Sequence, residues 1–141
     1  MSNSSNEKYT GYDFYLLNNI CYQKAHAICV EFLRHSKVLM EKKDFTILAP
    51  LINQCVRSSS SIAANISEGI CPVITVKDRI NKFSIAYKET IETIHWLSTI
   101  HDIEEISDEQ YAHLLDECTQ VAKMLNSSIL TLKSQLNKNN K

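Results

Sequence analysis

The chain has 141 residues, of which 44% are hydrophobic, with 15 Lys and Arg against 16 Asp and Glu. This length suits one domain with a single core, and the hydrophobic content argues against wholesale disorder. Two glycines and two prolines are too few for the tight turns of an all-β domain, so they favour long helices. A formal net charge of −1 argues against a surface devoted to gripping phosphates, although a balanced total leaves room for a local basic patch.

The N-terminal residues Met1 to Thr10 are polar, and nowhere in the chain do 18 apolar residues follow one another. We therefore expect a cytoplasmic protein without membrane contact. The five cysteines form no CxxC pair, which predicts reduced thiols and argues against a disulfide framework or a zinc site. They are Cys21, Cys29, Cys55, Cys71 and Cys118.

The first bundle helix is predicted over residues 19–40, after an N-terminal extension of residues 1–18. Aromatic residues between Tyr9 and Tyr15 make this extension apolar enough to pack on its own bundle or on a neighbouring one. The helix is indicated by apolar residues that recur at steps of three and four and so share one face. They are Ala25, Ile28, Cys29, Phe32 and Leu39.

The second helix is predicted to begin within residues 46–49, because Pro50 is tolerated only in the first turn of a helix. Gly69 is the expected stop after it, and Pro72 prevents continuation. The serine run 58–61 is typical of a flexible linker, but the apolar period passes through it without a change of phase, so we interpret it as helix. The predicted core positions are Leu48, Ile52, Cys55, Ser59, Ile62 and Ile66.

The third helix is predicted over residues 76–103, with Thr75 as its N-cap. The fourth opens at Ser107, where Gln110 completes a capping box. The core positions expected for the third helix are Ile80, Phe83, Tyr87, Ile91, Ile94 and Leu97. Those of the fourth are Tyr111, Leu114, Leu115, Cys118, Val121, Leu125, Ile129, Leu132 and Leu136.

Four amphipathic helices with short connections predict an all-α fold, an antiparallel up-down-up-down four-helix bundle. The bundle domain is expected over residues 19–137, followed by a polar tail of residues 138–141.

Two segments on separate predicted helices resemble a known family. Residues 57–69 read RSSSSIAANISEG, and residues 83–97 read FSIAYKETIETIHWL. In order and spacing they are similar to the bacterial four-helix-bundle family first noticed as proteins encoded in intervening sequences of 23S rRNA genes. The matching positions are Arg57, Ser58, Ser60, Ile62, Asn65, Ile66 and Glu68 in the first segment, and Ala86, Lys88, Glu89, Glu92, Thr93, Trp96 and Leu97 in the second.

The resemblance, over about residues 20–136, implies a helical bundle that assembles as a homo-oligomer, with a five-fold ring as the expected form. Relatives include the accessory protein of diversity-generating retroelements, a basic ring that serves a reverse transcriptase and its RNA. The present chain differs from that relative in its balanced charge. No enzymatic activity is established for the family that the chain resembles.

A line of mostly small residues on the second helix, roughly opposite its core stripe, is the first candidate interface. Arg57, Ser61, Ala64 and Glu68 share this line, with Asn65 beside it. Small residues allow another backbone to come close, so one interpretation is a face buried against a neighbouring helix or subunit. The other is an exposed, serine-rich surface.

The third helix carries two carboxylates, Glu89 and Glu92, between apolar residues on one face. A carboxylate that loses water needs a partner, so we expect Arg57 to pair with Glu92 or Glu89. The predicted interface or structural polar residues are Arg57, Ser61, Asn65, Glu68, Glu89 and Glu92.

No catalytic motif stands out. Glu92 and His95 make one Glu-x-x-His pair, whereas a di-iron bundle needs two such pairs and two further glutamates. There is no P-loop, GxSxG or HExxH motif, and the other helical histidines have no nucleophile at recognisable spacing. We therefore expect no enzyme, no metal and no cofactor.

Two basic clusters are candidate nucleic-acid contacts, expected at opposite ends of the bundle. They are Arg34, Lys37, Lys42 and Lys43 near the end of the first helix, and Lys77, Arg79 and Lys82 near the start of the third. One interpretation is ordinary solvated helix ends; the other is a phosphate-binding surface repeated around a ring. The sequence thus favours a non-enzymatic homo-oligomeric scaffold or adaptor that engages a protein or nucleic-acid partner. The alternative is a ring that binds RNA or DNA directly, as an accessory to a nucleic-acid enzyme.

Overall fold

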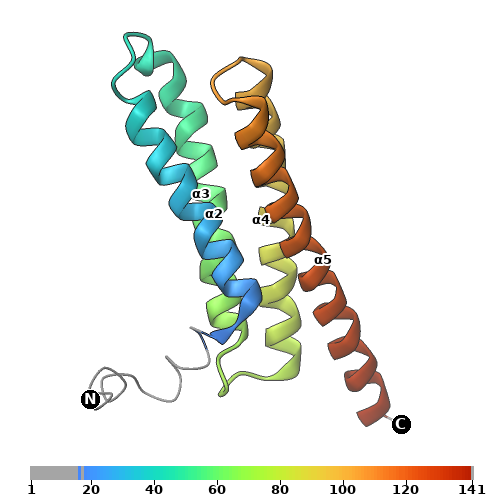
Figure 1. Cartoon of the computed structure of the whole chain (residues 1–141). Coiled ribbons are helices and arrows are strands. Elements are labelled where there is room, and N and C mark those ends of the chain that lie inside the picture. Colours follow the sequence, from blue (N-terminus) through green and yellow to red (C-terminus); the bar gives the residue numbers. More distant parts are fainter. Residues whose placement is uncertain (1–15, 17, 141) are drawn as a thin grey trace, which may run out of the picture.

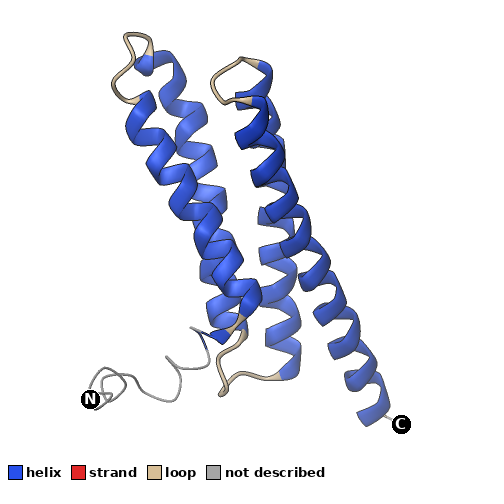
Figure 2. Ribbon diagram, viewed as in Figure 1, coloured by secondary structure: helices blue, strands red, loops and turns tan. Residues whose placement is uncertain are grey.

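The computed structural model describes residue 16 and residues 18–140. In this part of the chain four helices follow one another without a strand: α2 (Ile20–Leu39), α3 (Phe45–Gly69), α4 (Val76–Asp102) and α5 (Asp108–Asn139). Consecutive helices run antiparallel and are joined by short connections at alternate ends (Figures 1 and 2). The prediction of an all-α four-helix bundle is confirmed. The aromatic part of the predicted extension lies outside the described residues.

Side-chain caps fix the starts of α2, α4 and α5, whereas α3 begins without one. Asn19 accepts a hydrogen bond from the Tyr22 amide, and Thr75 accepts one from the Asp78 amide. Ser107 accepts one from the Gln110 amide, as the predicted capping box requires. These bonds satisfy amides that have no acceptor inside their own helix.

The core lies where α2, α3, α4 and α5 meet, and on three helices it follows the predicted stripes. Ile28 on α2, Ile62 on α3 and Val121 on α5 are among its fully buried members. None of the helices in the described part is long and apolar enough to cross a membrane.

On α4 the predicted core stripe was wrong in part. Ile91 is 48% exposed, whereas Thr90 and Thr93 are completely buried. Each threonine hydroxyl donates to the carbonyl four residues earlier, at 2.8 Å, so its burial leaves no donor unsatisfied. At these positions α4 therefore turns toward α3 small side chains whose hydroxyls are already bonded within their own helix, where the apolar period predicted larger side chains.

The expected start of α3 needs correction. The helix begins at Phe45, so Pro50 lies inside it, on the exposed side. Leu48 and Ile52 are buried on the other side, and this packing supports the turn that Pro50 weakens. Gly69 is the last helical residue, so the helix ends where we predicted, but its φ is not positive and the stop is not the left-handed one that is usual for glycine.

Gly69 is instead required by a close approach of two helices. A Cβ atom at this position would lie 2.5 Å from Cε1 of Phe83 on α4. The missing side chain therefore lets the end of α3 pack directly on the ring of Phe83.

The longest helix, α5, extends beyond the rest of the bundle at its C-terminal end. It has 32 residues against 20 in α2, and in Figure 1 its last turns continue below the start of α2. Lys24 lies opposite Glu117, so the second half of α5 runs beyond the N-terminus of α2. Residues 138 and 139 of the predicted polar tail are helical.

Candidate functional site

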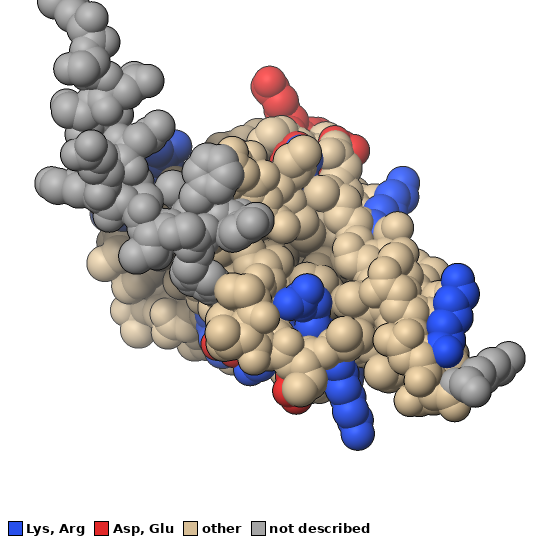
Figure 3. Space-filling view, turned by 90° about the horizontal axis from the view of Figure 1, so that it is seen from below, with Lys and Arg blue, Asp and Glu red and all other residues tan. Residues whose placement is uncertain are grey.

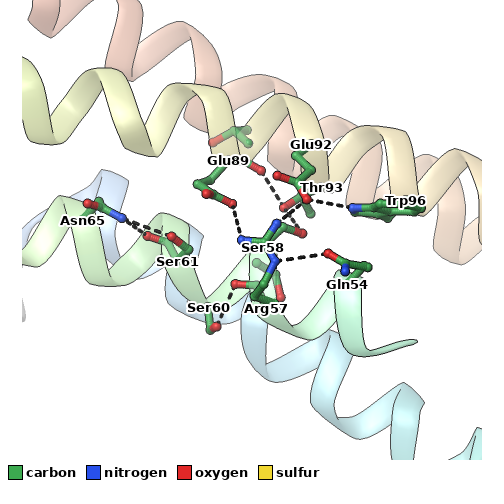
Figure 4. A network of polar contacts seen from close by, with 12 residues as sticks. Gln54, Arg57, Ser58, Ser60, Ser61, Asn65, Glu89, Glu92, Thr93 and Trp96 are labelled. Carbon is green, nitrogen blue, oxygen red and sulfur yellow. Dashed lines mark hydrogen bonds and ion pairs between the residues drawn. The ribbon is translucent and has the colours of Figure 1, made fainter. Parts of the chain in front are cut away.

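The polar residues predicted for an interface meet along the seam between α3 and α4 (Figure 4). Arg57 forms ion pairs with both Glu89, at 3.4 Å, and Glu92. Its Nε donates to the side-chain oxygen of Gln54 at 3.1 Å, and the Trp96 indole donates to Glu92 at 3.1 Å. The expected pairing of Arg57 is therefore seen within one subunit, and with both glutamates.

Hydrogen bonds from Arg57 and then from Trp96 hold the pKa of Glu92 below its ordinary value. The hydrogen bond to Glu92 likewise raises the pKa of Arg57. About half of the Arg57 side chain is exposed, so water screens the pair, and we expect it to contribute about 0.5–1 kcal/mol to stability. The network thus orients charged groups at the surface more than it stabilises the core.

Beneath this network two hydroxyls meet inside the bundle. Thr93 Oγ1 lies 3.0 Å from Ser58 Oγ, and both side chains are completely buried. Small polar residues allow α3 and α4 to come close, and the serine run belongs to the helix. The small buried residues are Ser58, Ser59 and Ala63, adjacent to the predicted line.

The predicted line itself is not buried within one chain. Arg57, Ala64 and Glu68 are exposed and Ser61 is half-buried, because this line lies at the rim of the α3–α4 seam. The Asn65 amide donates to the Ser61 carbonyl at 2.9 Å, and Glu68 pairs with Lys82 on α4. Within one subunit the line is thus largely exposed, and its burial against another subunit stays a prediction beside the interpretation of an exposed, serine-rich surface.

The first basic cluster lies beside acidic groups. Lys42 pairs with Glu105 of the α4–α5 connection, and His35 donates to the Glu105 carbonyl at 2.8 Å if its Nε2 carries the proton. Arg34, Lys37 and Lys43 are exposed at this same end. From Glu89 to Ala122 the sequence contains no Lys or Arg and nine acidic residues, so the positive charge of this cluster is largely balanced.

The second basic cluster lies at the other end, where α4 begins. Lys77 is exposed, Lys82 pairs with Glu68, and Arg79 donates to the Cys71 carbonyl at 3.1 Å. No Asp or Glu follows Glu117, whereas α5 carries Lys123, Lys133 and Lys138. In Figure 3, Lys and Arg side chains project at this end from a mostly uncharged surface.

Lys133 and Lys138 were not among the predicted contacts. They line a hollow on the last turns of α5. The signal that could have found them is the separation of charge along α5, with acidic residues in its first half and lysines in its second.

The histidines and cysteines form no reactive arrangement in the part of the chain that the structure describes. No group of three or more His, Cys, Asp or Glu side chains there could hold a metal ion. His95 is exposed and contacts the edge of Trp96. All five cysteines are free, and burial raises the pKa of Cys55 and of Cys118 to about 12.

Together these features define a small four-helix bundle with a charged α3–α4 seam and ends of unlike charge. Residues 18–127 match the family described as 23S rRNA-intervening sequence protein, and the chain belongs to this family. A solved structure from Bacteroides thetaiotaomicron, a protein of unknown function from the S23 ribosomal protein family, is 33% identical, with a TM-score of 0.69. The similarity covers 78% of this chain and 98% of that one. No curated protein matches the chain.

Proposed function

We propose that this protein is a cytoplasmic, non-enzymatic, homo-oligomeric bundle that acts as a scaffold or adaptor for a protein partner. The observation that carries this proposal is the exposure of large apolar side chains at the end where α2 meets α3. Val38, Met40 and Ile47 are 59%, 60% and 80% exposed. Large apolar side chains exposed at one end of a bundle favour contact with another protein there, and a second copy of the chain is the simplest partner.

Size-exclusion chromatography with light scattering tests self-assembly. We expect a discrete oligomer, with five subunits as the form that the family resemblance implies. Ile47→Glu is expected to shift the protein toward the monomer, because it places a charge in the covered surface. Thr46→Glu adds the same charge one residue away without removing an apolar group, and it should leave the assembly intact.

Circular dichroism on both variants separates a lost interface from a lost fold. A wild-type protein that is monomeric at about 100 μM would contradict self-assembly, since a stable interface has a far lower dissociation constant. Equal dissociation by Ile47→Glu and Thr46→Glu would contradict the role given to Ile47.

The second candidate is a ring that binds RNA or DNA directly, and the separation of charge supports it. Lysines and arginines at the end where α4 begins would be repeated around a ring, which multiplies a modest local charge. The contacts expected at this end are Lys77, Arg79, Lys82, Lys133 and Lys138.

Fluorescence anisotropy with a labelled single strand, across a range of salt concentrations, tests this candidate. The slope of log affinity against log salt should be about −0.7 for each phosphate neutralised. Lys133→Gln should weaken binding, whereas Lys43→Gln, at the end rich in acidic residues, should not. Absence of binding at low salt would contradict direct nucleic-acid binding.

A further inference from the structure

A groove of about 370 Å³ opens at the end of the bundle where α2 and α4 begin. Asn19, Arg79, Ser127, Ser128 and Thr131 form its polar wall. These residues come from the start of α2, the first turn of α4 and the second half of α5. They meet only because α5 continues past the start of α2.

Arg79 is held in this groove with part of its hydrogen-bonding capacity unused. Its Nη2 donates to the Cys71 carbonyl at 3.1 Å, whereas its Nε is buried and has no partner in the described chain. Buried donors in native proteins are rarely left without an acceptor, so this one calls for an explanation, and a ligand that brings acceptors to the guanidinium is one. No carboxylate lines the groove, so none there neutralises the guanidinium.

The hydroxyls on α5 are also available. Ser84, Ser98 and Thr119 elsewhere in the bundle donate to the carbonyl four residues earlier, at 2.7–2.9 Å. By contrast, Ser127, Ser128 and Thr131 make no hydrogen bond to any described residue. Ser127 and Thr131 are one helical turn apart, so both can reach the same ligand.

The remaining wall is apolar. Ile70, Phe83 and Leu132 line it. The ring of Phe83 packs against the end of α3 at Gly69, as described above. The volume lies within the range of about 300–1,000 Å³ that is usual for small-molecule sites.

We propose that this surface, the Arg79 groove, binds a phosphate group carried by a ligand of nucleotide size. A guanidinium and several hydroxyls are donors suited to phosphate oxygens, and the apolar wall would contact the ring system attached to the phosphate. The absence of acidic residues after Glu117 favours an anion at this end. The groove does not depend on self-assembly, and it deepens the second candidate by giving nucleic acid one defined phosphate contact.

The phosphate can belong to a free nucleotide or to a nucleic-acid chain, and titrations at constant ionic strength distinguish the two. The probes are inorganic phosphate, adenosine 5′-monophosphate and a short oligoadenylate, followed by isothermal titration calorimetry. We expect saturable binding of all three. Equal affinity for the monophosphate and the oligonucleotide identifies a free nucleotide, whereas tighter binding of the oligonucleotide identifies a chain.

Arg79→Gln is expected to weaken phosphate and nucleotide binding about tenfold or more, because a charge-assisted pair to phosphate is lost. Lys88→Gln is the matched control, because Lys88 is an exposed lysine of α4 that does not line the groove. It removes the same charge from the same helix outside the groove, and it should change the affinity less than about twofold. An equal loss of affinity in the two variants would overturn the proposal of a phosphate site in this groove, because it would show only general electrostatic attraction.

Arg79 also donates to the Cys71 carbonyl, so weaker binding by Arg79→Gln has two explanations, a lost ligand contact or a disturbed fold. A second variant separates them. Ser128→Ala combined with Thr131→Val removes two exposed hydroxyls that bond no described residue, and it should weaken binding about threefold. The proposal fails if wild-type protein shows no saturable binding at about 20 mM phosphate or nucleotide. It also fails if oligonucleotide binding survives Arg79→Gln unchanged, an outcome that leaves direct nucleic-acid binding standing.

Discussion

The hydroxyl oxygens of Ser58 on α3 and Thr93 on α4 lie 3.0 Å apart in the closed interior of the bundle. Thr93 Oγ1 also lies 2.8 Å from the Glu89 carbonyl, and Ser58 Oγ lies 3.4 Å from the Cys55 carbonyl. Two hydroxyl hydrogens thus serve three contacts, so the two side chains are energetically linked.

Thr93→Val is therefore expected to lower the free energy of unfolding by about 1 kcal/mol, because it leaves Ser58 with one poor partner at almost unchanged volume. In the double variant Thr93→Val, Ser58→Ala, the loss of unfolding free energy should be smaller than the sum of the losses in the two single variants. Urea unfolding measures both. Thr99→Val is the control, because its hydroxyl donates only to the His95 carbonyl near the surface, and an equal loss there would contradict the link.

The ion pairs of Arg57 predict a second coupling. A double-mutant cycle of Arg57→Ala and Glu92→Gln should give a coupling energy of about 0.5–1 kcal/mol, because both side chains are partly exposed. The same cycle with Glu89→Gln should give less, since that pair is separated by 3.4 Å. Both couplings should shrink at high salt. Additive losses in the Glu92 cycle would show that the pair does not contribute.

The lowered pKa of Glu92 predicts a dependence of stability on pH. The folded pKa lies below the ordinary value of 4.5, so the stabilisation is complete above that value and is lost as the pH falls through the folded pKa. The difference in unfolding free energy between wild type and Glu92→Gln should therefore vanish in acid. The indole proton of Trp96, the only tryptophan, reports the same titration by NMR. If the difference in unfolding free energy between wild type and Glu92→Gln persists unchanged at pH values far below 4.5, this assignment is contradicted.

Gly69→Ala should destabilise the bundle although alanine is the better helix former. The gain in helix propensity is at most about 1 kcal/mol. The added Cβ would lie 2.5 Å from Phe83 Cε1 in a packed region, and such overpacking costs about 1–3 kcal/mol. Thermal unfolding measures the net loss, and Phe83→Leu in the same chain should recover part of it. A stabilised Gly69→Ala single variant would show that the Phe83 ring moves freely.

Cys55 and Cys118 should resist alkylation in the folded protein. Burial raises the pKa of each to about 12, so at pH 8 only about one in ten thousand is ionised, and the thiolate is the reactive form. Peptide mapping after brief treatment with iodoacetamide measures each thiol separately. Cys71, half-buried in the α3–α4 connection, should react first, and all five should react in denaturant. Labelling of Cys118 as fast as Cys71 would contradict the closed core.

Local patterns in the sequence were enough to predict the helices and most of the core. Helix caps depend on residues three apart, as at Thr75 and Ser107, and an apolar period identifies the inward face of one helix from that helix alone. The pairing of Arg57 with Glu92 was also predictable, because carboxylates between apolar residues need a partner.

The failures concern distances between helices. The burial of Thr90 and Thr93 in place of Ile91 depends on how closely α3 approaches α4, and no period within one helix encodes that distance. Gly69 was given a backbone role because its packing partner Phe83 is 14 residues away.

What the sequence determined by itself, then, is a set of four amphipathic helices, their caps and their order, since all of these arise from neighbours along the chain. Only the tertiary structure decided which charges share an end of the bundle. It placed Lys42 beside Glu105 and brought Asn19, Arg79 and Thr131 to one groove. The physical reason is that α5 is longer than α2, so its second half passes the start of α2 and leaves a surface that three distant segments must complete.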